Sequence, residues 1–495
     1  MGRVLLYSPL WATCKKNNIF SFSLYDRIGR VFVKFFEDRK THALFWLMFG
    51  IVCLLNVNYS ILRSARTALT VADLGTGAGS IPVIELLGTM PSSLILVYLL
   101  TRLLNRFSIH KVFFISLAVF SGFFLFFSIG IYPSLPEWRA TLLEWTWLPA
   151  NAFWAVVLPQ TVSMLFFVMA ELWKIALLTV LFWGLVNQYV PLEDAKKFYA
   201  PLMLGGSVGT ILAGPIVSFC TSDLASRNSW SQSLTLMMLT LSLVGLFTAL
   251  LYSKLWRQFT GPKNEEPPPK QTLAVWESIR VCFRSRYLFL LAWITIADYI
   301  AYTLGEVVFL DVLKQKFPDP RIYCEYMGKL SLWSGILTAI SALFITPYLL
   351  QRCRWVVASL VTPVCILVTE GAFFIALWTP GIAGQIEVLV LLGTLFFCLA
   401  RAAKYTLFDT SKELSFILLS PLEKMQGKLI VDGMCSRVGR GGASMISILL
   451  IQVCGGVLAS APIAGCLVLF IAISCVISTL KLGVLVENKS EITSR

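Results

Sequence analysis

Long apolar stretches recur along the whole chain, and they constrain its fold more than any other feature. A helix needs about 20 mainly apolar residues to cross a bilayer, and windows of that length repeat from residue 43 to residue 486. The composition agrees, because 57% of the residues are hydrophobic and only 14% are charged. The alternation over about ten residues that marks an outer-membrane barrel does not occur. The sequence therefore predicts an all-α membrane protein.

We expect about twelve transmembrane helices. The window at 155–187 fits either one long tilted helix or two short ones, and we take one because the number of spans is then even. The expected spans are 43–63, 81–101, 111–132, 155–187, 198–219, 233–255, 287–310, 329–350, 355–377, 385–405, 438–458 and 462–486.

Basic residues are concentrated in the loops on one side of the predicted membrane. Lys and Arg total 41 against 27 for Asp and Glu, and their placement favours membrane topology over nucleic-acid binding. The positive-inside rule predicts that both termini are cytoplasmic, in the inner membrane of a bacterium. No removable signal peptide is expected at the start. The twelve cysteines stand singly, without a CxxC pair, which predicts neither a disulfide frame nor a metal or cofactor site.

A charged, proline-rich stretch, "TGPKNEEPPPKQT" at 260–272, divides the chain near its middle. About six spans lie on either side, and an offset of about 230 residues places Pro191 on Pro421 and Lys174 on Lys404. Two six-helix repeats are typical of major-facilitator-like transporters, which bind substrate between the halves. The predicted segments are a basic cytosolic N-terminal segment at 1–42, a six-helix half at 43–258, a cytosolic linker at 259–285, a second six-helix half at 286–487 and a cytosolic tail at 488–495.

Charged residues within or beside the spans are the candidate substrate ligands, because a charge at the bilayer centre costs at least about 2.5 kcal/mol and should face a wet cavity. Cations predominate, and Arg binds phosphate oxygens with two parallel hydrogen bonds, so an anionic substrate is expected. The candidates are Arg63, Arg66, Glu171, Lys174, Glu306, Arg401, Lys404, Lys428, Arg437 and Arg440, with Asp298 beside Glu306 in the seventh span.

Two alternatives for these charges stay open. Glu171 and Lys174 are three residues apart and can neutralise each other on one helix face. Arg63 with Arg66, and Arg401 with Lys404, repel each other on one face unless an anion lies between them, but at a helix end they can also snorkel to the membrane surface.

Residues for catalysis are scarce. Only His42 and His110 are present, and no HExxH, GxSxG or P-loop motif occurs. The glycine runs at 204–214 and 438–444 are typical of close helix packing. We therefore expect a protein that is not an enzyme. The alternative of another class is a membrane-embedded transferase acting on a phospholipid or a polyprenyl phosphate, which would also need basic residues near the interface.

Several long sequence pieces carry a resemblance to a known family. In chain order they are "NYSILRS" with the arginine that follows, "FFVMAELWKIALLTVLFWGLVNQ", "EDAKKFYAPLMLGGSVGTILAG", "GEVVFLDVLKQKFPDP" followed by "YMGKLS", and "AAKYTLFDTSKELSFILL" with "GKLIVDGMCSRVGRGG". At these residues the chain resembles the nucleotide translocases (ATP/ADP carriers) of obligate intracellular bacteria and plastids, and the resemblance covers nearly the whole chain. It implies twelve spans, exchange of ATP and ADP by alternating access, and functional charges at Glu171, Glu306 and Lys428.

The chain departs from that family at one functional position. Where the family reads L-R-x-x-K-D, this chain has Arg66 and Thr67, which keeps the cation and loses the acid. Arg has a planar guanidinium group with several N–H donors and Lys a compact ammonium group, so the geometry of the site changes. The departure leaves open a proton-coupled importer of GTP, UTP, CTP or NAD, in which Glu171 and Glu306 carry the protons.

Overall fold

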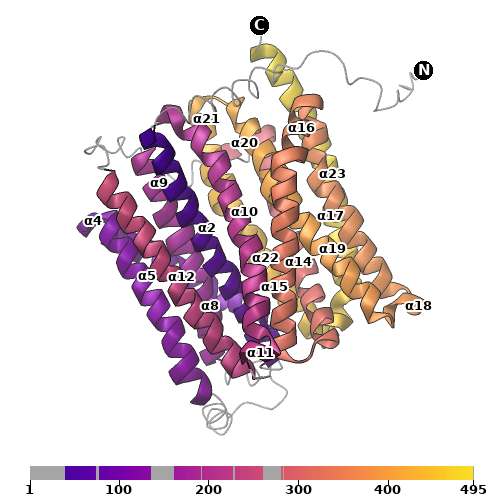
Figure 1. Cartoon of the computed structure of the whole chain (residues 1–495). Helices are drawn as coiled ribbons and strands as arrows, with labels where there is room; N and C mark the ends of the chain where they lie inside the picture. The colour runs from indigo at the N-terminus through magenta and orange to yellow at the C-terminus, as the bar shows by residue number, and fades with distance from the viewer. Residues whose placement is uncertain are drawn as a thin grey trace, which may run out of the picture.

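The computed structural model describes residues 39–73, 77–134, 161–190, 192–226, 229–259, 280–282 and 284–493, and every regular element in these ranges is helical. Most of the expected N-terminal segment at 1–42 and of the expected linker at 259–285 lies outside the described residues. Figure 1 shows the helices as one bundle, with the earlier helices (indigo to magenta) beside the later ones (orange to yellow).

The helices of the first half, with π-helical segments labelled η, are α2 (Arg39–Ala68), η1 (Leu69–Asp73), α3 (Ser80–Val83), η2 (Ile84–Thr89), α4 (Met90–Arg106), α5 (Ile109–Phe126), η3 (Phe127–Ile131), α8 (Thr161–Trp173), η5 (Lys174–Phe182), α9 (Trp183–Tyr189), α10 (Leu192–Thr221), α11 (Asp223–Ser226) and α12 (Trp230–Gln258). Those of the second half are α14 (Arg286–Lys316), α15 (Pro320–Ile340), η6 (Ser341–Ile345), α16 (Thr346–Arg352), α17 (Trp355–Trp378), α18 (Pro380–Ala383), α19 (Ile386–Ala403), η7 (Lys404–Phe408), α20 (Asp409–Ile417), α21 (Pro421–Lys428), η8 (Leu429–Cys435), α22 (Ser436–Cys454) and α23 (Val457–Thr493).

Eleven helical runs in the described ranges are long and apolar enough to cross a membrane. The expected span at 438–458 is not among them. It belongs to the continuous helical run 421–454, which at about 1.5 Å per residue is long enough to cross. Arg437, Arg440 and the glycines between and beside them make this run more polar than the others. The described part of the ambiguous window at 155–187 forms a single helical run, which extends from Thr161 to Tyr189, and residues 155–160 lie outside the described residues.

The first helix is longer than the sequence analysis predicts. The expected span ends at residue 63, but the helical run continues through Arg66 to Asp73. Arg63 and Arg66 therefore lie inside the run, and only 12% and 9% of their side chains are exposed. Snorkelling to a membrane surface, the alternative left open for this pair, is wrong because neither side chain reaches a helix end.

Local signals in the sequence set several helix starts. Asp319 caps α15 by accepting a hydrogen bond from the backbone N of Arg321 at 2.8 Å, and Pro320 occupies the first turn. Ser420 and Glu423 form a reciprocal capping box at the start of α21. These caps fix where the polar ends of the long apolar helices lie.

The two halves repeat one helix contact. Gly209 on α10 lies so close to α2 that a Cβ would overlap the carbonyl oxygen of Cys53. Gly439 on α22 lies in the same way against α14, where a Cβ would come 3.1 Å from the carbonyl oxygen of Ile296. The glycine runs thus allow close helix packing at equivalent places in both halves, as the sequence predicts.

The halves meet along α10 and α15, which lie side by side next to α11 in Figure 1. Near α11, Arg321 donates a hydrogen bond to the carbonyl oxygen of Thr221 at 3.3 Å and forms a salt bridge with Asp223. The backbone N of Ala78 donates to Asp311 Oδ1 of the other half at 3.1 Å. These contacts hold the halves together at the α11 end of the bundle.

Candidate functional site

Seven charged side chains from both halves interact electrostatically with one another inside the bundle. They come from five different helical runs, so only the tertiary fold brings them together. We call this set the central charge cluster: Arg63, Arg66, Glu85, Glu171, Lys174, Glu306 and Arg440. Six of its seven members are among the ten candidates from the sequence analysis. The seventh, Glu85, was not selected there.

A salt bridge between the two halves lies in this cluster. Arg63 Nη2 on α2 is 3.0 Å from Glu306 Oε1 on α14. Position 306 lies 243 residues after position 63, and the same interval separates Tyr59 from Tyr302 and Cys53 from Ile296. Arg63 and Glu306 therefore occupy equivalent positions of the repeat. Their salt bridge joins the first helix of one half, α2, to the first helix of the other half, α14.

Glu171 is the most heavily partnered carboxylate of the cluster. Arg66 Nη1 lies 2.5 Å from Glu171 Oε1, and the Tyr59 hydroxyl donates to the same oxygen at 3.3 Å. Lys174 Nζ is 3.9 Å from Glu171 Oε2, which is the pair on one helix face that the sequence analysis left open as an alternative. The Arg66 guanidinium also lies 4.2 Å from the centre of the Phe167 ring, a cation–π contact.

The paired cations of the second half are arranged differently from the prediction. Lys404 is buried in a salt bridge with Asp298, and its Nζ lies 3.4 Å from the centre of the Tyr299 ring. Arg401 lies over Phe397 at 5.3 Å. The expected anion between Arg401 and Lys404 is therefore not required: a carboxylate from another helix holds Lys404, just as Glu306 and Glu171 hold Arg63 and Arg66.

Two carboxylates, one partly buried and one fully buried, were missed by the sequence analysis. Glu85 on η2 accepts a hydrogen bond at 3.3 Å from Ser444 on α22, across the halves. Glu370 on α17 is fully buried, and neither carboxylate oxygen has a hydrogen-bond partner within the described part of the chain. Both are single acids inside long apolar windows, so the rule that selected Glu171 and Glu306 could have found them.

Lys428 and Arg437 lie away from the most heavily paired part of the cluster. Lys428 ends α21 and pairs with Glu413 on α20 at 2.5 Å. It precedes Arg440 by twelve residues of continuous helix, or about 18 Å along the axis. Arg437 is exposed one turn before Arg440. The fold thus separates Lys428, at the α21 end of the bundle, from the cluster around Arg440.

Arg440 indicates where the open space lies. Its side chain is exposed, and it interacts electrostatically with Glu171 and Glu85 of the other half. It also lies 5.2 Å from the centre of the Tyr299 ring. An exposed side chain that faces the other half must point into the space between the halves.

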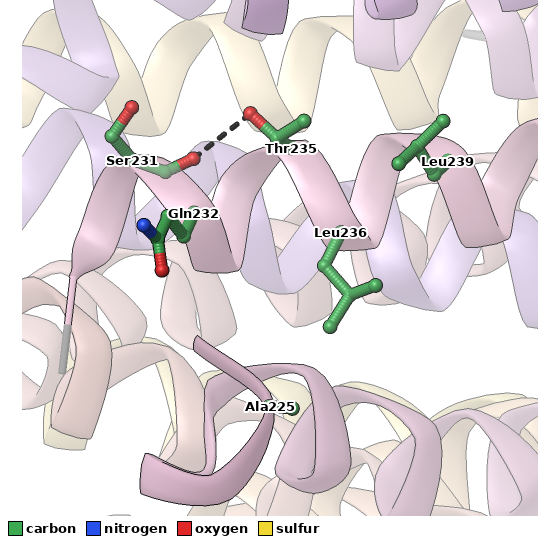
Figure 2. A pocket seen from close by; sticks show the side chains of 6 residues that line it. All are labelled: Ala225, Ser231, Gln232, Thr235, Leu236 and Leu239. Atoms are coloured by element: carbon green, nitrogen blue, oxygen red, sulfur yellow. Dashed lines mark hydrogen bonds between the residues drawn. The ribbon is translucent and has the colours of Figure 1, made fainter. Parts of the chain in front are cut away.

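The shallow, open pocket drawn in Figure 2 has a different chemistry. It lies between α11 and the start of α12 and is lined by Ala225, Ser231, Gln232, Thr235, Leu236 and Leu239. The Thr235 hydroxyl donates to the carbonyl oxygen of Ser231 at 3.0 Å. None of these described lining residues is charged, so they offer no cation to a phosphate group.

The arrangement of the cluster suits a ligand that has both a negatively charged group and a flat ring. Four cations, Arg63, Arg66, Lys174 and Arg440, face three carboxylates, which leaves a formal excess of one positive charge. Aromatic rings pack beside the cations on both halves. In the described ranges, no group of His, Cys, Asp or Glu side chains is placed to hold a metal ion.

Solved structures with a similar fold are transporters. The crystal structure of a mutant of the nucleoside transporter NupG superposes with a TM-score of 0.54 at 15% identity, covering 89% of this chain and 98% of that chain. A POT family transporter in complex with 5-aminolevulinic acid also gives a TM-score of 0.54, at 10% identity, covering 90% and 96%. At these identities the likeness concerns the fold, which is that of major-facilitator-like transporters with two six-helix halves.

Sequence relatives define the family. ADP,ATP carrier protein 1 of Chlamydia trachomatis serovar D is 31% identical over 451 residues, which cover 86% of this chain and 84% of the relative. The chloroplastic ADP,ATP carrier protein 1 of Arabidopsis thaliana is 32% identical over 435 residues, covering 84% and 69%. Residues 31–485 match the family described as TLC ATP/ADP transporter. The resemblance drawn from the sequence pieces is thereby confirmed, and this chain belongs to the TLC ATP/ADP transporter family.

Proposed function

We propose that the protein exchanges ATP and ADP across a membrane by alternating access between its two halves. The observation that carries the proposal is the central charge cluster, in which cations from both halves face one space within the bundle. The relatives named ADP,ATP carrier proteins support the choice of nucleotides. The ten charged candidates predicted from the sequence remain the proposed substrate site, in which the cations bind the phosphate groups and Glu171 and Glu306 hold cations of the empty carrier.

In this proposal the carboxylates of the cluster hold the cations when no substrate is bound. Glu306 and Glu171 occupy Arg63 and Arg66, and the phosphate groups of an incoming nucleotide compete for the same guanidinium groups. Replacing Glu306 as the partner of Arg63 breaks the salt bridge between the halves. Substrate binding is then coupled to breaking the contact between the halves. A carrier without substrate keeps this contact and does not change conformation, so exchange is favoured over movement of the empty carrier.

We further propose that the α21 end of the bundle faces the cytoplasm of a bacterium and that the protein lies in the inner membrane. The positive-inside distribution of Lys and Arg supports this orientation. The contacts at Arg321 and Asp311 then lie on the outer side, so the structure represents a state closed to the outside. The segment boundaries at 42, 258, 285 and 487 are part of the same proposal.

Counterflow into proteoliposomes tests the function. The wild-type protein should take up labelled ATP and ADP only when unlabelled nucleotide is present inside, and GTP, UTP, CTP and NAD should serve as competitors of graded strength. Uptake of no phosphorylated nucleoside, in vesicles shown to contain folded protein, would contradict the proposal.

One observation favours a second candidate, a proton-coupled nucleotide importer. Burying an unpaired charge costs far more free energy than burying a neutral carboxyl group, and Glu370 is fully buried with no hydrogen-bond partner in the described part of the chain, so it is the group proposed to carry the proton. If proton movement drives uptake, an uncoupler should abolish it, and Glu370→Gln, which fixes the neutral form, should remove its dependence on a pH gradient. Uptake that needs internal nucleotide and ignores uncouplers would exclude this candidate.

The salt bridge between the halves predicts a measurable coupling. We expect Arg63→Gln and Glu306→Gln each to lower the thermal stability in detergent, because each leaves a charge unpaired inside the bundle, and the double variant to recover part of that loss. The control pair is Lys316 and Glu387, which lies within one half and has 76% of the Glu387 side chain exposed. Its coupling should stay below about 1 kcal/mol. Equal coupling in both pairs would contradict a special role for Arg63 and Glu306.

A further inference from the structure

Tyr405 is an exposed aromatic residue in the middle of a buried stretch. It belongs to the π-helical segment η7, where its neighbours Lys404 and Thr406 are 6% and 5% exposed, whereas Tyr405 is 47% exposed. The side chain therefore points away from the packed core of the second half, either towards lipid or towards the space between the halves.

Its neighbours decide between these two directions. Tyr405 interacts electrostatically with Arg63 of α2 and Lys174 of η5, both in the first half, and with Arg440 of α22. A lipid-facing residue of the second half could not be close to all three. The Tyr405 ring therefore lies in the space between the halves, among cations of the central charge cluster.

The other aromatic rings of the cluster already have cations over their faces. Lys174 lies over Tyr59 at 5.0 Å, Arg440 over Tyr299 at 5.2 Å, and Arg63 over Phe397 at 4.9 Å. Tyr405 has only Arg401, at 5.8 Å from its centre. It is also the only one of these four rings that is exposed, so it offers the largest free aromatic surface to a bound molecule.

A nucleotide needs both kinds of surface that meet here. Its phosphate groups require cations, and its base presents a flat π-face that stacks on aromatic side chains regardless of the base. We propose that Tyr405 is the stacking surface for the nucleobase, while the phosphate groups lie towards Arg66, Lys174 and Arg440. This assignment rests on the proposed nucleotide transport and adds to it the residue that holds the base.

The test separates the base from the phosphates. Binding to the purified protein is measured for ATP and, by competition, for inorganic tripolyphosphate, which has the charge without the base. Tyr405→Ala should weaken ATP binding by about fivefold to a hundredfold, the usual effect of removing a stacking aromatic, and should leave tripolyphosphate competition unchanged. Tyr405→Phe keeps the ring and should bind ATP like the wild type.

The control is Tyr348→Ala on α16, another exposed tyrosine that lies outside the cluster, and it should change neither ligand. Equal weakening of ATP and tripolyphosphate by Tyr405→Ala, or a Tyr405→Phe variant as weak as Tyr405→Ala, overturns the stacking role. If Tyr405→Ala fails to fold, Tyr405→Leu, which keeps the bulk without the π-face, replaces it in the same comparison. A wild-type protein that binds and transports no nucleotide overturns the proposed function itself, a result distinct from any change at Tyr405.

Discussion

Replacing Gly209 with alanine will prevent the first half from folding as it does in the wild type. The added Cβ would overlap the carbonyl oxygen of Cys53 on α2 and would also lie 2.9 Å from the Cβ of Asn56. A backbone oxygen cannot rotate away as a side chain can, so α2 and α10 must separate along their contact. We expect a loss beyond about 3 kcal/mol, the upper end for overpacked cores, seen as little folded protein in size-exclusion chromatography and a lowered Tm.

Gly442→Ala is the matched control. Gly442 lies in the equivalent glycine run of the second half, but nothing lies within 4 Å of its Cβ position. That variant should fold and even gain slightly, because alanine is the better helix former. A Gly209→Ala protein as stable as Gly442→Ala would show that α2 and α10 are not in contact as described.

Arg66→Gln is expected to reduce nucleotide affinity by about ten- to hundredfold, the loss of a charge-assisted bond to a phosphate group. The effect should rise from AMP through ADP to ATP, because it depends on the number of phosphate groups. The buried neighbour adds a second effect: Glu171 loses its 2.5 Å partner and keeps only Lys174 at 3.9 Å. Stability should therefore fall together with affinity, and Arg66→Lys should preserve most of both.

Glu171→Gln distinguishes the two effects of Arg66. If Glu171 competes with phosphate for Arg66, the Glu171→Gln variant should bind ATP at least as tightly as the wild type. Its transport rate should be lower, because Arg66 then has no carboxylate partner when the carrier is empty. Arg257→Gln, an exposed arginine at the end of α12, serves as the charge control and should change neither quantity. Equal weakening of AMP and ATP by Arg66→Gln would assign Arg66 a purely structural role.

The sequence by itself was sufficient for the membrane class, the helical fold and the family. Apolar windows of about 20 residues predict helices that cross a membrane, and glycine runs predict close contacts between helices. Both predictions depend only on residue type and local spacing. The repeat could be recognised in the same way, since Lys174 and Lys404 stand at equivalent places and each opens a π-helical segment. Single charges inside the windows marked most of the central charge cluster.

Only the tertiary structure decided which charges meet. Spacing along one helix suggested that Arg63 and Arg66 act as a pair on one face, whereas the fold gives each its own carboxylate, Glu306 from α14 and Glu171 from α8. Partners 243 and 105 residues away along the chain cannot be read from local periodicity, because they depend on how whole helices pack. For the same reason the sequence could not show that Lys404 is buried against Asp298 while its neighbour Tyr405 stays open between the halves.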